Sequence, residues 1–222
     1  MFDFLNDYDV VGAFWVTVQL TLYSAIGSLV WGTLLAAMRV SPVPMMRGFS
    51  TVYINTVRNI PLTLIIVATS LALYQTLGIE LGGGTSKEVS FKLAVLGLVA
   101  YHACFVCESL RSGINTVPVG QAEAARALGL KFSQVLSVIV LPQAFRSVVA
   151  PLANVLIALT KNTTVASAIG VAEAAYVMKN MIEFNPDVLF LVFAIFAFGF
   201  VVLTLPAGML LGWVSKRVAV KR

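Results

Sequence analysis

Long apolar runs alternate with short polar segments along the whole chain. Each run holds roughly 20 or more residues, and a helix needs about 20 residues to cross the hydrocarbon core of a bilayer. The pattern therefore predicts an all-α integral membrane protein, with about five transmembrane helices in a single domain over residues 1–222. The expected spans are residues 10–38, 52–77, 91–110, 147–169 and 188–214, with a short connection at 39–50 and a flexible loop at 78–90.

Two of the five runs carry a cation with polar neighbours in their interior. The second carries Arg58, Asn59 and Pro61 in its first half, and the fourth is interrupted by residues 161–164. Cations are costly in hydrocarbon, so each is expected to face a cavity, a group of carbonyls or a partner subunit. Residues 171–187 are of mixed polarity and are expected at the membrane interface; an extra span or a re-entrant piece around residues 165–178 stays open.

The longest polar segment, residues 111–146, is expected to be a loop that contains a short surface helix. Gly120 is a tolerable N-cap, which places Glu123 at the third helical position, where its charge suits the helix N-terminus. We expect Gly129 to end this helix. A second helix over residues 132–141 should then be interrupted or redirected by Pro142.

The composition supports the same class of protein. Hydrophobic residues make up 59% of the chain and charged residues 11%, and the mean hydropathy is +0.92. A soluble domain of this length could not bury that much apolar surface. Two cysteines give no disulfide framework. No cleavable signal is expected, because Asp3, Asp7 and Asp9 stand where a signal peptide would be positive.

The distribution of cations predicts the orientation in the membrane and explains the net charge of +5 better than nucleic-acid binding does. Cytoplasmic loops of membrane proteins carry an excess of Lys and Arg. With the N-terminus outside and the C-terminus in the cytoplasm, the outer segments hold at most Lys87, Lys92, Lys161 and Lys179. The cytoplasmic segments then hold Arg39, Arg47, Arg111, Arg126, Lys131, Arg146, Lys216, Arg217, Lys221 and Arg222.

The polar loop carries a spaced motif. Glu123, Ala124 and Ala125, then Gly129 and the run Ile-Val-Leu-Pro at 139–142, resemble the EAA loop of permease subunits of ATP-binding-cassette importers. The resemblance implies a type I importer permease fold, in which this loop is a cytoplasmic coupling helix seated in a groove of a separate ATPase. The residues it assigns to coupling are Gly120, Glu123, Ala124, Ala125, Gly129 and Pro142. An ordinary surface helix linking two spans is the alternative.

Two further segments resemble polar amino-acid importers. Residues 53–62 are similar to the second-span signature of that family, with Asn59 and Ile60 where Gly and Thr are usual. Residues 161–164 are similar to the Lys-Asp-Thr-Ser sequence of its fourth span, with Asn162 in place of Asp. A cation with hydroxyls and amides nearby suits a carboxylate, and two cations suit two carboxylates. The candidate substrate-binding residues are Arg58, Asn59, Pro61, Lys161, Asn162, Thr163 and Thr164.

Structural roles for these residues are also open. Arg58 and Lys161 could reach a lipid headgroup, Pro61 could kink a helix, and the polar residues 162–164 could bond across helices.

The segment before the polar loop narrows the resemblance. Residues 108–114 and 118–121 are similar to the corresponding part of polar amino-acid permeases, and residues 107–109 with 112–115 resemble actinobacterial glutamate-importer permeases. The resemblance implies transport of glutamate in a bacterial plasma membrane, or of a neutral or cationic amino acid. It also implies a second permease, identical or homologous, ATPase subunits that bind ATP and Mg, and an extracytoplasmic solute-binding protein.

Other classes of protein fit the sequence less well. The glycine triplet at 82–84 is not a phosphate-binding loop, so this chain is expected to bind no cofactor and not to hydrolyse ATP. An ion-coupled secondary transporter predicts carboxylates within the spans, where only Glu108 stands near an end, and there it can pair with Arg111 or contact a gate. A channel or an assembly factor would need no ATPase.

The remaining titratable residues are expected to be structural. Cys104 and Cys107 are interpreted as small packing residues, and His102 lacks a second metal ligand nearby in the sequence. Glu173 and Glu183 are expected to be solvated.

Overall fold

The computed structural model describes residues 7–218, and every regular element in that range is helical. The predictions that involve Asp3, Lys221 and Arg222 lie outside the described residues. The elements are α1 Val10–Val40, α2 Pro44–Val57, α3 Leu62–Ala68, η2 Thr69–Thr76, α4 Ser86–Ile114, α5 Val119–Ala127, α6 Phe132–Gln134, η3 Val135–Val140, α7 Leu141–Asn162, η4 Thr163–Ile169, α8 Ala174–Phe184, η5 Pro186–Val188 and α9 Leu189–Val218. Of these, η2 and η3 are π-helical, and η4 and η5 are 3-10 helices.

Four helical segments in the described residues are long and apolar enough to cross a membrane: Val10–Arg39, Ser86–Ile114, Val135–Ile169 and Pro186–Val214. A fifth arises if α2 and the segment Leu62–Thr76 are counted as one bent span. The prediction of an all-α membrane protein with about five spans is therefore confirmed.

The second predicted span is not one straight helix. Its two parts meet at an angle of 105°, and the break falls between Val57 and Leu62. Pro61 explains the break, because proline disfavours a helical conformation in the residue before it and lacks the N–H that would continue the hydrogen-bond ladder. The helix also begins earlier than expected, at Pro44, so the connection after α1 is only residues 41–43 rather than 39–50.

Other predicted boundaries were wrong too, since the third span is Ser86–Ile114 rather than 91–110 and the fourth is Val135–Ile169 rather than 147–169. The loop expected at 78–90 ends by Thr85, which caps α4 by accepting from Glu88 N, while the Glu88 side chain accepts from Thr85 N. Pro142 does not interrupt the chain before the fourth span: it stands in the first turn of α7, where a missing N–H is tolerated, directly after the π-helical η3.

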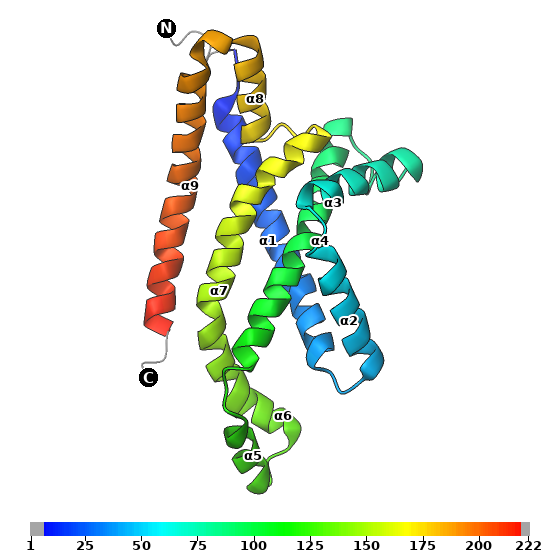
Figure 1. Cartoon of the computed structure of the whole chain (residues 1–222), viewed down its shortest axis with the longest axis vertical. Coiled ribbons are helices and arrows are strands. Elements are labelled where there is room, and N and C mark those ends of the chain that lie inside the picture. The colour runs from blue at the N-terminus through cyan, green and yellow to red at the C-terminus, as the bar shows by residue number, and fades with distance from the viewer. Residues whose placement is uncertain (1–6, 219–222) are drawn as a thin grey trace.

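Helix α4 is the centre of the bundle and packs against α1, α2, α3 and α7 (Figure 1). The side of α1 that faces inward carries small residues, among them Ser24, Ser28 and Gly32. A Cβ atom at Gly32 would stand 2.6 Å from Cβ of Val106 and 2.8 Å from a backbone carbonyl of α4. Small residues let helix backbones approach closely in lipid, where the hydrophobic effect does not drive helices together.

The two cysteines belong to this packing, as predicted. Cys104 and Cys107 are fully buried in a cluster with Leu35 and Ile54, which joins α4 to α1 and α2.

Glu173 is buried, contrary to the expectation that it would be solvated; Glu183 is exposed as expected. The Glu173 carboxylate caps α8, with one oxygen accepting from Ala175 N and the other from Tyr176 N, each at 2.9 Å. Beside it, Ala174 N donates to the hydroxyl of Thr17 on α1. A cap that would normally face water is covered here because α8 folds back onto α1. This burial raises the pKa of Glu173 to about 7.

The raised pKa predicts an unusual pH dependence. The folded chain binds the Glu173 proton more tightly than the unfolded chain, so stability should fall as pH rises from about 4.5 to above 7, by at most about 3 kcal/mol. Glu173→Gln should remove this part of the pH dependence, and Glu183→Gln should leave it intact. Thermal unfolding of the purified protein in detergent between pH 4.5 and 8 measures both. An unchanged pH profile in Glu173→Gln would contradict the assignment.

Candidate coupling helix and candidate substrate cavity

Helix α5 protrudes from one end of the bundle, beyond the ends of α4 and α7 (Figure 1). It begins at Val119 after Pro118, so the prediction of Gly120 as N-cap was wrong and Glu123 is the fifth helical residue rather than the third. Proline at this position fixes the backbone dihedral angle φ that leads into the helix. Gly129 follows the helix with φ +87°, and the prediction that it ends α5 is confirmed.

The surface of α5 is mixed in character. Glu123 and Ala124 are exposed, whereas Ala125 is buried on the side of α5 that packs against η3. Two apolar side chains at its ends point away from the bundle: Val119 is 71% exposed and Leu128 is 82% exposed. Exposed apolar side chains beside a charge, on a small protruding helix, favour docking into a groove of another protein.

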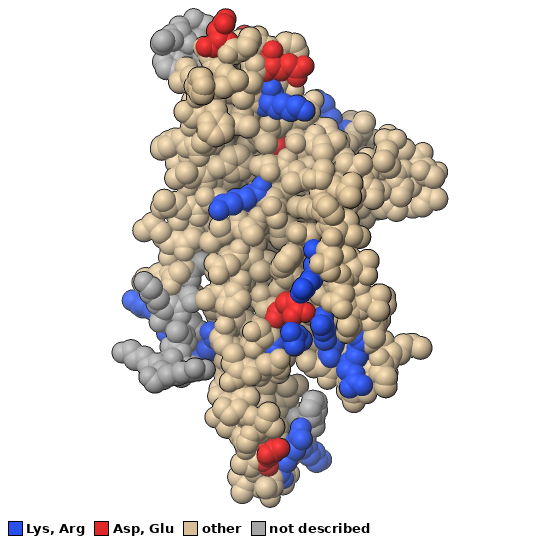
Figure 2. Space-filling model, in the orientation of Figure 1, with Lys and Arg blue, Asp and Glu red and all other residues tan. Residues whose placement is uncertain are grey.

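Positive charge gathers at the end of the molecule that carries α5. In Figure 2 most of the blue atoms lie in the lower half of the view, which corresponds to the α5 end in Figure 1. Glu108 of α4 lies there in an ion-pair cluster, with Arg39 of α1 at 2.9 Å from one oxygen and Arg111 at 2.9 Å from the other. The predicted pair of Glu108 with Arg111 is thus present, and Arg39 extends it to a second helix.

The two groups of candidate substrate residues lie on neighbouring elements. Arg58, Asn59 and Pro61 stand at the break between α2 and α3, and residues 161–164 stand where α7 becomes the 3-10 helix η4. Because α3 packs directly on η4, the structure brings the two groups to the same region of the bundle. Arg58 and Lys161 are both exposed in the single chain.

Several of these polar side chains donate hydrogen bonds to backbone carbonyls of the preceding turn. The Asn59 amide donates to the carbonyl of Asn55 at 2.6 Å, Thr163 donates to the carbonyl of Thr160, and Thr164 to that of Lys161. These bonds satisfy the hydroxyls and the amide locally, and Thr163 is fully buried.

Asn162 is the candidate that lines a cavity with both polar and apolar side chains on its wall. This cavity, about 270 Å³ in volume, lies between α4 and α7 and is lined by Tyr101, His102, Phe105, Asn154, Val155, Ala158 and Asn162. The Asn162 amide nitrogen is 3.2 Å from Nε2 of His102, whose Nδ1 is 3.1 Å from the carbonyl of Leu98. A neutral imidazole that donates from Nδ1 and accepts at Nε2 satisfies both contacts.

His102 was missed as a site residue in the sequence. In the sequence, His102 has no metal ligand nearby that would mark it as a site residue. Its partner Asn162 lies 60 residues away on another helix. Only the crossing of α4 and α7 reveals the pair.

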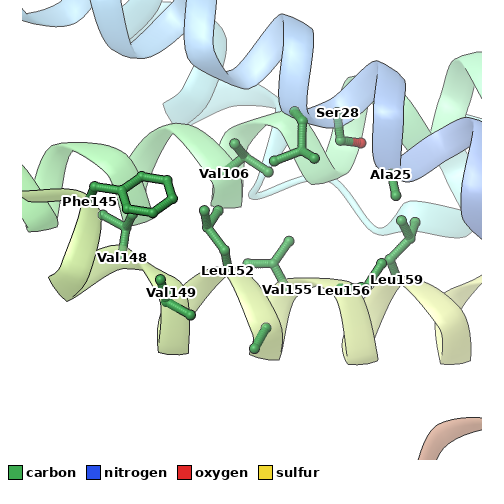
Figure 3. Close-up of a pocket in the computed structure, with 12 residues that line it drawn as sticks. Ala25, Ser28, Val106, Phe145, Val148, Val149, Leu152, Val155, Leu156 and Leu159 are labelled. Carbon is green, nitrogen blue, oxygen red and sulfur yellow. The ribbon is translucent and has the colours of Figure 1, made fainter. Parts of the chain in front are cut away.

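A second cavity has a different character. Between α1, α4 and α7, about 260 Å³ is lined by apolar side chains such as Phe145, Leu152 and Leu156, with Ser28 as the polar member (Figure 3). A zwitterionic solute would lose its hydration in such a space without gaining hydrogen bonds. Of these two cavities, the one at His102 and Asn162 is therefore the better candidate for a polar substrate.

A bundle of membrane-spanning helices with an exposed helix at one end, and with polar residues on the wall of a cavity between its helices, is typical of a transport permease. Residues 28–220 match the model of the binding-protein-dependent transport system inner membrane component family, and the chain belongs to that family. It is the membrane-embedded permease component of such a transport system rather than an ATPase.

Individual relatives agree with this assignment. The chain is 59% identical over 214 residues to the glutamate transport system permease protein GluC of Corynebacterium efficiens, which covers 95% of this chain and 94% of the relative. It is 30% identical to the probable glutamine ABC transporter permease protein GlnM of Bacillus subtilis, over 98% of this chain and 96% of the relative. A crystal structure of an amino acid ABC transporter with histidines matches with a TM-score of 0.83 and 25% identity, over 94% of this chain and 93% of that one.

The positive φ of Gly129 gives a test of the α5 geometry. Gly129→Val should tilt α5, because a β-branched residue in the left-handed region costs about 1–2 kcal/mol, whereas Gly129→Asn should be tolerated. We expect transport to be lost in the Val variant and largely kept in the Asn variant, with equal amounts of both in the membrane. Uptake normalised to the inserted protein measures this. Normal uptake by Gly129→Val would contradict a role for the orientation of α5.

Proposed function

We propose that this chain is a transmembrane subunit of an ATP-driven glutamate importer. The observation that carries the proposal is the 59% identity, over 95% of the chain, to a permease named for glutamate transport, together with a polar cavity beside the predicted residue Asn162. The assembled transporter would accept the amino acid from an extracytoplasmic binding protein and release it into the cytoplasm of a bacterium.

The partners follow from α5 and from the size of the bundle. ABC ATPase subunits, which would hold ATP and Mg, dock on α5 through the exposed side chains of Glu123, Val119 and Leu128. A second permease, identical or homologous, completes the pathway, because a single chain of about five spans encloses little cavity on its own.

The orientation proposed from the sequence has the N-terminus outside and α5 with the C-terminus in the cytoplasm. The cations that surround Glu108 and α5 support it, because positive loops are retained on the cytoplasmic side. ATP binding would then close the ATPase dimer beneath α5 and switch the pathway between inward-facing and outward-facing states by rigid-body motion.

The chemistry of the cavity favours an anionic or neutral amino acid over a cationic one. Among the seven residues that line it in the described part of the chain, none is acidic, so a cationic side chain would find no counter-charge. The amides of Asn154 and Asn162 and the hydroxyl of Tyr101 can donate to carboxylate oxygens. Lys161, next to Asn162, and Arg58, at the break before α3, are the cations available for the two carboxylates of glutamate.

Glutamine is the second candidate substrate, because the same amide donors suit any α-carboxylate and a relative is named for glutamine transport. An ion-coupled secondary transporter is disfavoured, since both oxygens of Glu108 are already paired with arginines.

Reconstitution tests the function. The chain, its ATPase and its binding protein in liposomes should take up radiolabelled glutamate only with ATP, and unlabelled glutamine or arginine should compete poorly. Asn162→Asp should reduce glutamate uptake by about tenfold, because a carboxylate in the cavity repels the substrate. Asn185→Asp, the same change outside the cavity, is the control. Uptake without ATP would refute the importer, and unimpaired uptake by Asn162→Asp would refute the cavity assignment.

A further inference from the structure

Helix α5 is attached to the bundle by few contacts. It is joined to α4 through residues 115–118 and to α6 through residues 128–131. Ala125 is the one buried residue of α5, which packs against η3. Any displacement that an ATPase imposes on α5 must reach the membrane helices through these attachments. A short connection with a glycine at φ +87° transmits force poorly, so direct side-chain contacts between α5 and the spans matter most.

One such contact joins α5 to α7. Nε2 of Gln143 donates to Oε1 of Gln121 on α5 at 2.7 Å, and also to the carbonyl of Ile139 at 2.9 Å. Gln143 stands in the first turn of α7, directly after Pro142. The second bond fixes the Gln143 side chain against η3, the segment that leads into α7, so its amide presents one defined position to Gln121.

A second contact joins α4 to α7 at the same level. The hydroxyls of Thr116 and Ser147 are 3.2 Å apart, and Ser147 Oγ is 3.3 Å from the carbonyl of Gly113. Gly113 has no side chain here because a Cβ would collide with Val148 and stand 3.1 Å from the Ala144 carbonyl. The end of α4 and the start of α7 therefore move as one unit.

We infer that the bond between Gln121 and Gln143 is the positioning contact through which α5 moves α7, so that Gln143 sets how much substrate is transported for each ATP hydrolysed. The inference rests on the proposed function and deepens it. Helix α7 connects the contact to the candidate cavity, since Asn162 lies 19 residues beyond Gln143, about 28 Å along the same helix, with Pro151 between them. Rigid elements with two arrangements are the physical carriers of such coupling.

The inference assigns different consequences to different substitutions of Gln143. Gln143→Leu removes the donor at similar volume. Gln143→Glu keeps the bond to Gln121, because the Gln121 amide can turn and donate to the new carboxylate, but it loses the bond to the Ile139 carbonyl. Gln121→Leu removes the same bond from the other side, so the double variant Gln121→Leu with Gln143→Leu should be no worse than either single variant.

The test measures glutamate uptake and ATP hydrolysis together in reconstituted complexes of equal composition. In Gln143→Leu, the uptake per ATP hydrolysed should fall about fivefold, the factor that corresponds to one net hydrogen bond, while ATP hydrolysis continues. Gln143→Glu, which keeps one of the two bonds, should restore part of the ratio. Gln75→Leu, which removes the same amide from an exposed position on η2, is the matched control and should behave as wild type.

Each alternative result is decisive. An unchanged ratio in Gln143→Leu would overturn the inference, and so would failure of this variant to co-purify with the ATPase, because the pair would then serve docking alone. A double variant that is worse than both single variants would show that the two residues act separately. If the proposed function itself is wrong, the wild-type complex would lack ATP-dependent glutamate uptake, which distinguishes that failure from failure of the inference.

Discussion

The membrane-spanning part depends on glycines at which helix backbones come almost into contact with neighbouring helices. At Gly32 α1 lies against α4, and at Gly113 α4 lies against α7. In lipid, such close approach through small residues replaces the hydrophobic effect as the source of helix association. The three helices are thus held in close contact at these glycines, which couples the α5 end of the bundle to its membrane-spanning helices.

The polar residues in the spans differ in the partners that they find. Thr17, Thr160 and Thr163 donate to carbonyls one turn earlier in the chain, which satisfies these hydroxyls without any ligand, whereas the hydroxyls of Ser24 and Ser28 are buried without a hydrogen-bond partner. His102 and Asn162 instead meet across two helices at the wall of a cavity. Polar groups inside a membrane are costly, so a pair that faces a cavity rather than a helix carbonyl is the stronger indication of a transport path.

Much of the fold could be predicted from the sequence because the apolar runs are long and the polar loop carries turn residues with a clear physical effect. Gly129 ended α5 as expected, since its role depends on local backbone geometry alone. The break at Pro61 was only an open alternative, and the start of α2 at Pro44 was missed, because a run of apolar residues does not show where a helix bends.

The candidate site was less predictable for a different reason. Asn162 was selected by a local motif, but His102, 60 residues earlier, has no local signal and becomes a neighbour only through packing. Glu173 was expected in solvent because charge favours exposure, yet the return of α8 onto α1 buries it. The roles of Arg58, Lys161 and the remaining candidate residues stay predictions from the sequence.

The central claim is that α5 is the docking site for an ATPase, and photocrosslinking tests it most directly. A photoreactive amino acid would replace Leu128, 82% exposed on α5, or Leu77, 64% exposed after η2, in the complex assembled in the membrane. Leu128 should crosslink to the ATPase subunit and Leu77 should not. Crosslinking of the ATPase at position 77, or none at position 128 in a complex that transports, would contradict the account.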